Sequence, residues 1–135
     1  SMKQSNNSQQ IHGMLDLQGF YFVFYVSVYI LQEIDYCRTV VLSVHDDVGV
    51  RTVMQELLAA SQSPTASECW SAVVILHTFC DKTSADYSDY LPQLFRGLIG
   101  LFTNSSEKVL HAAWDCLNAV TKVSTFKCNY YLIYK

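Results

Sequence analysis

The sequence lacks any cluster of basic residues. Its 135 residues include nine Lys or Arg against twelve Asp or Glu, which gives a net charge of −3, and no two basic residues are adjacent. A surface that binds the phosphate backbone needs concentrated positive charge to displace counterions. We therefore expect no direct nucleic-acid partner.

A membrane-spanning segment is also missing. The apolar run Phe20–Leu31 has 12 residues, whereas a helix needs roughly 20 residues to cross the bilayer core. No basic region directly precedes this run, and Gln32, Glu33 and Asp35 follow it, which is unlike a signal peptide. We expect neither membrane insertion nor secretion, and we place the chain in the cytoplasm.

Paired cysteine motifs are absent. The five cysteines are odd in number, are scattered along the chain and form no C-x-x-C pair. This usage is typical of reduced thiols in the cytosol.

Motifs for catalysis, metal binding and nucleotide binding are absent as well. The four histidines are far apart, and the nearest approach to a ligand cluster is His77 with Cys80 and Asp81. Two ligands without a second pair are poor evidence for a metal, so packing is the preferred interpretation of His77. Gly97 and Gly100 belong to a helical pattern and not to a phosphate-binding loop. We expect no enzyme, no catalytic residue, no metal and no cofactor.

Two stretches of the chain repeat each other at an offset of about 41 residues. Sliding the chain by this offset aligns Val53, Leu57 and Leu58 with Leu94, Leu98 and Ile99, and Cys69, Ala72 and Leu76 with Leu110, Ala113 and Leu117. Each stretch shows the i, i+3, i+4, i+7 spacing of amphipathic helices. Because one helical hairpin cannot bury its apolar face alone, repeats of this kind stack and present a surface to other macromolecules.

The spacing predicts an all-α architecture of two helical hairpins plus an N-terminal helix. The expected helices cover about 20–43, 48–60, 64–80, 87–102 and 107–122. Residues 1–18 are expected to be a flexible lead that opens with a protease-cleavage scar, Ser1-Met2. Residues 123–135 lose the helical period and are expected to form a tail, either frayed or a short helix imposed by the rest of the chain.

Residues 42–122 resemble a known family. The runs that carry the resemblance are LSVHDDVGVRTVMQELLAAS, SADYSDYLPQLFRGLIGLF and SSEKVLHAAWDCLNAVTK. They are similar to a stretch of the very large HEAT-repeat translational activators of the general-control-nonderepressible type. The resemblance implies a HEAT/armadillo-like α-solenoid fragment of a scaffold that couples ribosomes to the amino-acid-starvation kinase. A general HEAT or armadillo interaction module, such as a transport or phosphatase scaffold, is the alternative.

The flanks depart from this family. GTAAGT, a splice-donor sequence, would encode Val123-Ser124, and a thymine-rich tract ending in CAG would encode FYFVFYVSVYILQ. We hypothesise that residues 33–122 correspond to one exon and that both flanks are translated intron. The alternative is that both flanks belong to the protein, the first as an apolar helix and the second as a tail.

Candidate protein contacts are the aromatic and charged side chains outside the apolar stripes. They are Trp70, Arg51, Arg96 and Lys108, and the predicted helices over 64–80 and 107–122, the second helix of each hairpin, are the best candidates for a contact surface. Trp114 lies on the predicted inner stripe and is expected in the core. Two repeats cut from a longer stack leave apolar ends, so self-association is also expected.

Overall fold

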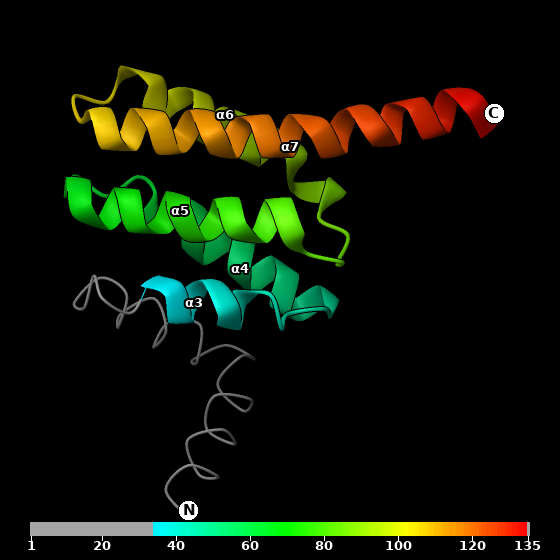
Figure 1. The fold of residues 1–135 in the computed structure, drawn as a ribbon, viewed down its shortest axis with the longest axis horizontal. Helices are drawn as coiled ribbons and strands as arrows, with labels where there is room; N and C mark the ends of the chain where they lie inside the picture. The colour runs from blue at the N-terminus through cyan, green and yellow to red at the C-terminus, as the bar shows by residue number, and fades with distance from the viewer. Residues whose placement is uncertain (1–33, 135) are drawn as a thin grey trace, which may run out of the picture.

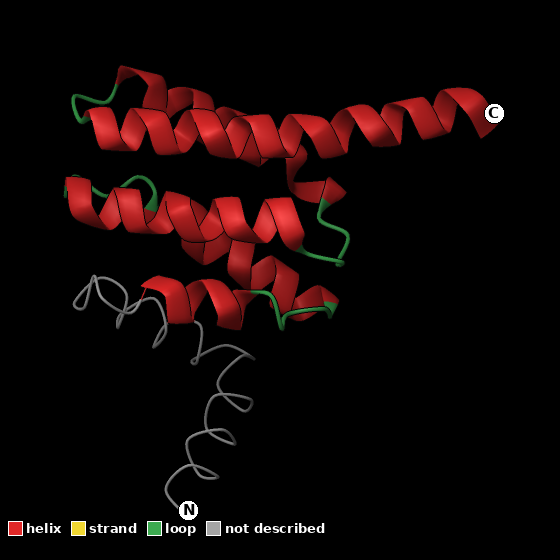
Figure 2. Ribbon diagram, viewed as in Figure 1, coloured by secondary structure: helices red, strands yellow, loops and turns green. Residues whose placement is uncertain are grey.

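The computed structural model describes residues 34–134, and side chains are described as far as Ser124. All regular structure in this range is helical, with no strand (Figure 2). The elements are α3 (Ile34–Val41), α4 (Asp47–Ala60), α5 (Ala66–Lys82), the 3₁₀ turn η2 (Ser88–Tyr90), α6 (Leu91–Gly100), the 3₁₀ turn η3 (Leu101–Thr103) and α7 (Glu107–Tyr134). None of the helices within residues 34–134 is both long and apolar enough to cross a membrane.

The helices form two stacked hairpins, α4–α5 and α6–α7, with α3 before them. Helix α5 packs against α3, α4 and α7, and α6 packs on α7. Figure 1 shows α3, α5 and α7 in the nearer layer, with α4 and α6 behind them. This two-layer stack confirms the predicted all-α solenoid fragment.

The repeat seen in the sequence is also a repeat of the structure. Helix α5 begins at Ala66 and α7 begins at Glu107, 41 residues later (107 − 66). The aligned pair Leu57 and Leu98 is fully buried, as is the aligned pair Val53 and Leu94. Equivalent positions on α4 and α6 are therefore buried in the same way in both hairpins.

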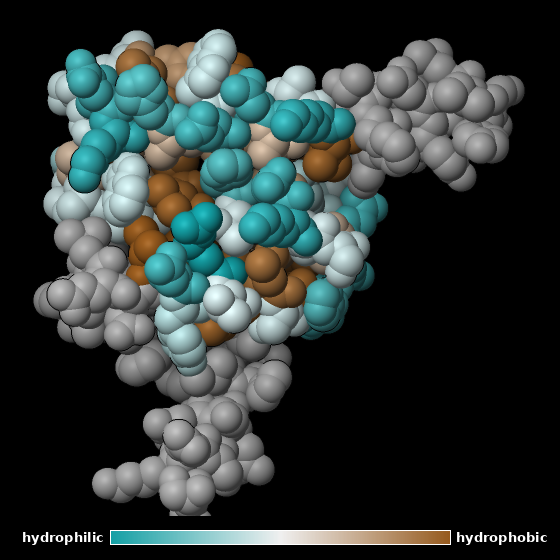
Figure 3. All heavy atoms as spheres, viewed as in Figure 1, coloured by the Kyte–Doolittle hydropathy of each residue, from teal (hydrophilic) through white to brown (hydrophobic). Residues whose placement is uncertain are grey.

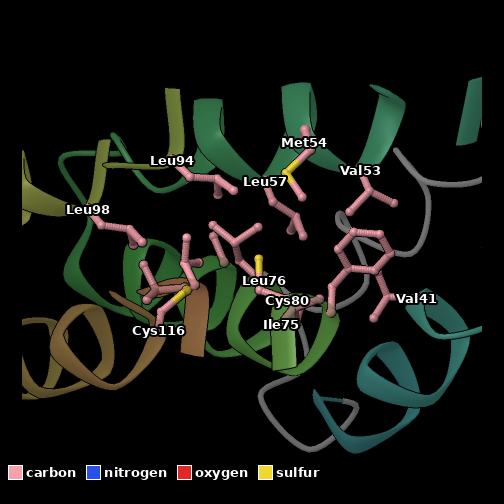
Figure 4. Close-up of a cluster of buried hydrophobic side chains, with 14 of the residues drawn as sticks. Val41, Val53, Met54, Leu57, Ile75, Leu76, Cys80, Leu94, Leu98 and Cys116 are labelled. Atoms are coloured by element: carbon pink, nitrogen blue, oxygen red, sulfur yellow. The ribbon is translucent and has the colours of Figure 1, made fainter. Parts of the chain in front are cut away.

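One core joins the two hairpins and α3. It brings together Val41 of α3, side chains of α4 such as Met54, side chains of α5 such as Leu76, and Cys116 of α7 (Figure 4). The buried face of α7 carries small or medium side chains, those of Val109, Ala112, Ala113, Cys116 and Val120. Small side chains on this face allow the close approach of α7 to α5.

Helix α5 begins two residues later than the predicted start at 64. Its N-cap is Thr65, in extended conformation, and Pro64 lies before the helix. The Ser63 hydroxyl accepts a hydrogen bond from the Thr65 amide at 3.2 Å and donates one to the Glu68 carboxylate at 2.6 Å. Ser63 therefore organises the turn, while the helix proper begins beyond it and continues to Lys82.

The predicted helix over 87–102 is divided into three parts. The turns η2 and η3 flank α6, and Pro92 lies in the first turn of α6. Proline is accepted there because its missing amide has no helical partner. Helix α6 therefore starts directly after Tyr90 and not at the predicted residue 87.

Of the two predictions for the tail over 123–135, the structure shows the helical one for residues 123–134, as a continuation of α7 to Tyr134, and the predicted helix end at 122 is wrong. From Glu107 onward the sequence contains neither glycine nor proline, so nothing in the chain ends the helix at Lys122. Of the predicted N-terminal helix over 20–43, the described part is α3. The remainder of that prediction, like the flexible lead over 1–18, lies outside the described residues.

Trp114 is not a core residue, contrary to the prediction. Its side chain is 55% exposed and lies against Phe102, with 5.4 Å between the ring centroids. Trp114 is one residue from the buried Ala113, and one residue turns the side chain by about 100° around the helix. Its equivalent in α5, Val73, is fully buried because α5 has both α3 and α7 as neighbours.

Candidate protein-contact surfaces

The fold divides the four predicted contact residues between its two helix layers. Trp70 on α5 and Lys108 on α7 belong to one layer, while Arg51 on α4 and Arg96 on α6 belong to the other. Of the four predicted residues, the structure brings only Trp70 and Lys108 together.

Trp70 and Lys108 form a cation–π contact between the two stacked helices. The Lys108 ammonium lies 5.3 Å from the centroid of the Trp70 ring. Lys108 is exposed and Trp70 is half-buried, so the contact is worth about 0.5–1 kcal/mol. The remaining accessible surface of Trp70 is available to a partner.

This pair stands at one end of a groove between α5 and α7. The groove has a volume of about 400 Å³ and is lined by Trp70, Val74 and His77 of α5 and by Glu107, Lys108, His111, Ala112 and Asp115 of α7. Its lining combines apolar side chains with charges of both signs. Such a surface suits contact with a protein segment, since interfaces pair an apolar centre with a polar rim.

Sequence reasoning missed His111 and Asp115 as members of this groove. The offset of 41 residues could have found His111, because it stands on α7 where Trp70 stands on α5 (111 − 70). The fold also separates the suggested ligand cluster, since His77 is half-buried at the groove while Cys80 is buried in the core. Within residues 34–124, no three His, Cys, Asp or Glu side chains are grouped to hold a metal.

The layer of α3, α5 and α7 is predominantly hydrophilic at its surface. In Figure 3, which views this layer, hydrophobic side chains appear as separate patches among hydrophilic ones. Interface energy usually depends on a few anchoring side chains. On this layer we therefore expect a single side chain, Trp70, to anchor a partner, and not a broad apolar face.

The thiols of Cys80 and Cys116 are buried and do not form a reactive site. A hydrogen bond with Cys116, and then burial, raise the pKa of Cys80 well above its usual value. A raised pKa keeps the thiol protonated, and the protonated form is a poor nucleophile. Both cysteines act as core residues here.

A second groove lies between α4 and α6. It has a volume of about 460 Å³ and is lined by Met54, Gln55, Leu58, Ala59, Gln62, Tyr90, Gln93, Arg96 and Gly97. Arg96 is thus at a groove, whereas Arg51 is exposed on α4 and lines neither groove. The glutamines and Tyr90 were not predicted, and their spacing alone carries no signal for them.

The family model described as stalled ribosome sensor GCN1-like, HEAT repeats, matches residues 27–127. The chain is 46% identical over 90 residues to stalled ribosome sensor GCN1 of Mus musculus, an alignment that covers 67% of this chain and 3% of the mouse protein. It is 44% identical over 90 residues to the Homo sapiens protein of the same name, with the same coverage. The chain thus spans about 3% of the length of these relatives. No solved structure matches it.

Proposed function

The chain belongs to the family of GCN1-like HEAT repeats, and on this premise we propose that it acts as part of a scaffold in translational control. The role is to couple ribosomes to activation of the amino-acid-starvation kinase. The family match over residues 27–127 carries the proposal, because it covers the described helices α3 to α6 and α7 as far as residue 127. The names of the two relatives, stalled ribosome sensors, support the ribosomal half of it.

In this proposal the chain works by protein contact and without catalysis, in the cytoplasm. The contact surface is the groove between α5 and α7, with Trp70 as its anchor and Lys108 beside it. Tryptophan offers a large, rigid contact area, which is why it is frequent among residues that dominate binding energy. The partners are the ribosome and the starvation kinase, and no nucleic acid is contacted directly.

The test uses the full-length scaffold that contains this segment. Replacing Trp70 with Ala and Lys108 with Ser in the same protein is expected to weaken cosedimentation with ribosomes, or activation of the kinase during starvation, by at least about fivefold. The matched control is Arg51→Ser, which changes an exposed cation outside the groove. If the double variant retains full ribosome binding and full kinase activation, as the control is expected to do, this surface has no part in either function. Retention of both activities after deletion of residues 47–122 would overturn the role of the whole segment.

The last hairpin of the stack also supports self-association or stacking on a further repeat. Leu58 of α4 contacts α6 at Gly97, where an added methyl group would lie 3.2 Å from the Leu58 Cδ2 atom. The residue equivalent to Leu58 in the second hairpin is Ile99, which is 53% exposed. We propose that Ile99 and Trp114 are covered either by a second copy or by the next helical hairpin of a longer protein.

A further inference from the structure

The groove between α4 and α6 differs in shape and chemistry from the groove between α5 and α7. Helix α4 packs on α5, and α6 packs on α7. The groove of about 460 Å³ lies between α4 and α6. Gly97 contributes to this hollow because it has no side chain on the α6 side. Leu58 of α4 is half-buried and supplies apolar contact area, while Met54 lies beneath it in the core.

The polar lining of this groove is suited to a peptide backbone. Gln55 and Gln62 line it from α4, Gln93 lines it from α6, and Tyr90 lies just before α6. Gln55, Gln62 and Gln93 are exposed, and Tyr90 is half-buried. Each primary amide can donate and accept hydrogen bonds, as can the Tyr90 hydroxyl. Side chains of this kind can pair with the alternating N–H and C=O groups of an extended segment.

The charge of this groove has one sign. Arg96 lines it, and no Asp or Glu is among the lining residues. Within residues 34–124 no carboxylate lies within ion-pair distance of Arg96, since the ion pair in this range joins Arg38 and Asp35. A guanidinium matches a carboxylate through two parallel hydrogen bonds. The unpaired cation therefore calls for an anionic side chain from outside.

We infer that the groove between α4 and α6 binds an extended, acidic peptide segment of a partner protein, with an Asp or Glu side chain paired to Arg96. The glutamines hold the backbone of the segment, and Leu58, which is half-buried, contacts one of its apolar side chains. The net charge of the whole chain is −3, so an acidic segment is repelled by much of the molecule and attracted at Arg96. This contact goes beyond the proposed translational role and uses the other helix layer.

The probe is an array of random ten-residue peptides, incubated with the 135-residue chain and with two variants. The first variant, Arg96→Gln, removes the cation of the groove, and the second, Arg51→Gln, removes an exposed cation outside it. We expect a set of peptides, enriched in Asp and Glu, whose binding falls at least tenfold with Arg96→Gln and less than twofold with Arg51→Gln. Replacing the acidic residue of such a peptide by Gln is expected to cause the same loss, with no further loss when both changes are combined.

A second pair of variants tests the shape of the groove. Gly97→Val fills the α6 side of the groove, whereas Gly100→Val adds the same side chain to the same helix where no heavy atom lies within 4 Å. We expect Gly97→Val to abolish binding of the acidic peptides and Gly100→Val to retain it, with circular dichroism confirming that both variants are helical. The inference is overturned if no peptide responds to Arg96→Gln, if the responding peptides are neutral or basic, or if they bind only when they carry phosphoserine.

Discussion

The hydroxyl of Tyr87 donates a hydrogen bond to the backbone carbonyl of Cys80, with 2.7 Å between the two oxygens. Cys80 lies in the last turn of α5, where carbonyls lack amide partners within the helix. Tyr87 is buried, and its ring lies 6.0 Å from that of Phe79. A residue of the loop that joins the two hairpins thus caps the end of α5.

Removing this hydroxyl is expected to destabilise the chain. Tyr87→Phe keeps the ring but leaves the Cys80 carbonyl without its donor, at a cost of about 1 kcal/mol in the free energy of unfolding. Urea denaturation followed by circular dichroism measures the change. Tyr36→Phe is the control, since Tyr36 is 41% exposed, and it should leave the midpoint unchanged. Equal stability of the two variants would contradict the capping role.

Stability is expected to fall in alkali, in two stages. Burial raises the pKa of Tyr87, and a thiol hydrogen bond followed by burial raises that of Cys80. When the pKa of a group is higher in the folded state than in the unfolded state, the unfolded state loses its proton first as the pH rises. The contribution of the group to the free energy of unfolding is therefore fully present below its ordinary pKa and declines above it. The free energy of unfolding should decline above about pH 8.5 through Cys80 and more steeply above about pH 10 through Tyr87. In Tyr87→Phe the second decline should be shallower, and an unchanged slope would contradict this assignment.

Two glycines should respond to alanine in opposite ways. A Cβ atom at Gly49 would lie 2.6 Å from Val44 Cγ1 and 2.6 Å from Asp46 Oδ1, whereas at Gly100 it would meet no atom within 4 Å. Val44 is buried and cannot move away freely. Gly49→Ala should therefore destabilise by about 1–3 kcal/mol, while Gly100→Ala should stabilise by roughly 0.5–1 kcal/mol through helix propensity. Thermal unfolding of both variants measures this, and a gain in melting temperature for Gly49→Ala would contradict the predicted clash.

Two buried serines form another opposed pair. Within the described part of the chain the Ser71 hydroxyl has no hydrogen-bond partner, whereas the Ser61 hydroxyl donates to the Leu58 carbonyl at 2.7 Å and accepts from the Gln62 amide at 3.1 Å. Ser71→Ala should be neutral or stabilise by up to about 1 kcal/mol, and Ser61→Ala should cost about 1 kcal/mol. Calorimetric melting temperatures distinguish the two. A larger loss for Ser71→Ala than for Ser61→Ala would show that Ser71 has a partner.

The exposed residues of the last hairpin are expected to mediate self-association of the chain. Sedimentation velocity at increasing concentration should show a rising weight-average mass, because Ile99 and Trp114 expose apolar surface. Ile99→Asp together with Trp114→Glu should shift the chain toward monomer. Val48→Asp changes an exposed apolar residue at the start of α4 and should have little effect. A monomeric profile for the unmodified chain at high concentration would rule out this contact.

The sequence by itself determined which segments are helical and how they repeat. Apolar residues at helical spacing, such as Val53, Leu57, Leu94 and Leu98, predict buried stripes because the period of the α-helix is local and independent of the rest of the fold. Helix ends were less predictable. Helix α5 begins two residues after the predicted start because Ser63 organises a turn before it, and α7 continues past Lys122 because no residue there stops it.

Only the tertiary structure decided which apolar residues are covered and which polar ones meet. Trp114 belongs to an apolar stripe, but its exposure depends on whether a neighbouring helix lies over it, and helical spacing carries no information on neighbours. The contact of Trp70 with Lys108, and the separation of Arg96 from both, follow from the stacking of one hairpin on the other. These side chains are 38 and 26 residues from Trp70 in the sequence (108 − 70 and 96 − 70), so their distances in space depend on packing over the whole core and not on local periodicity.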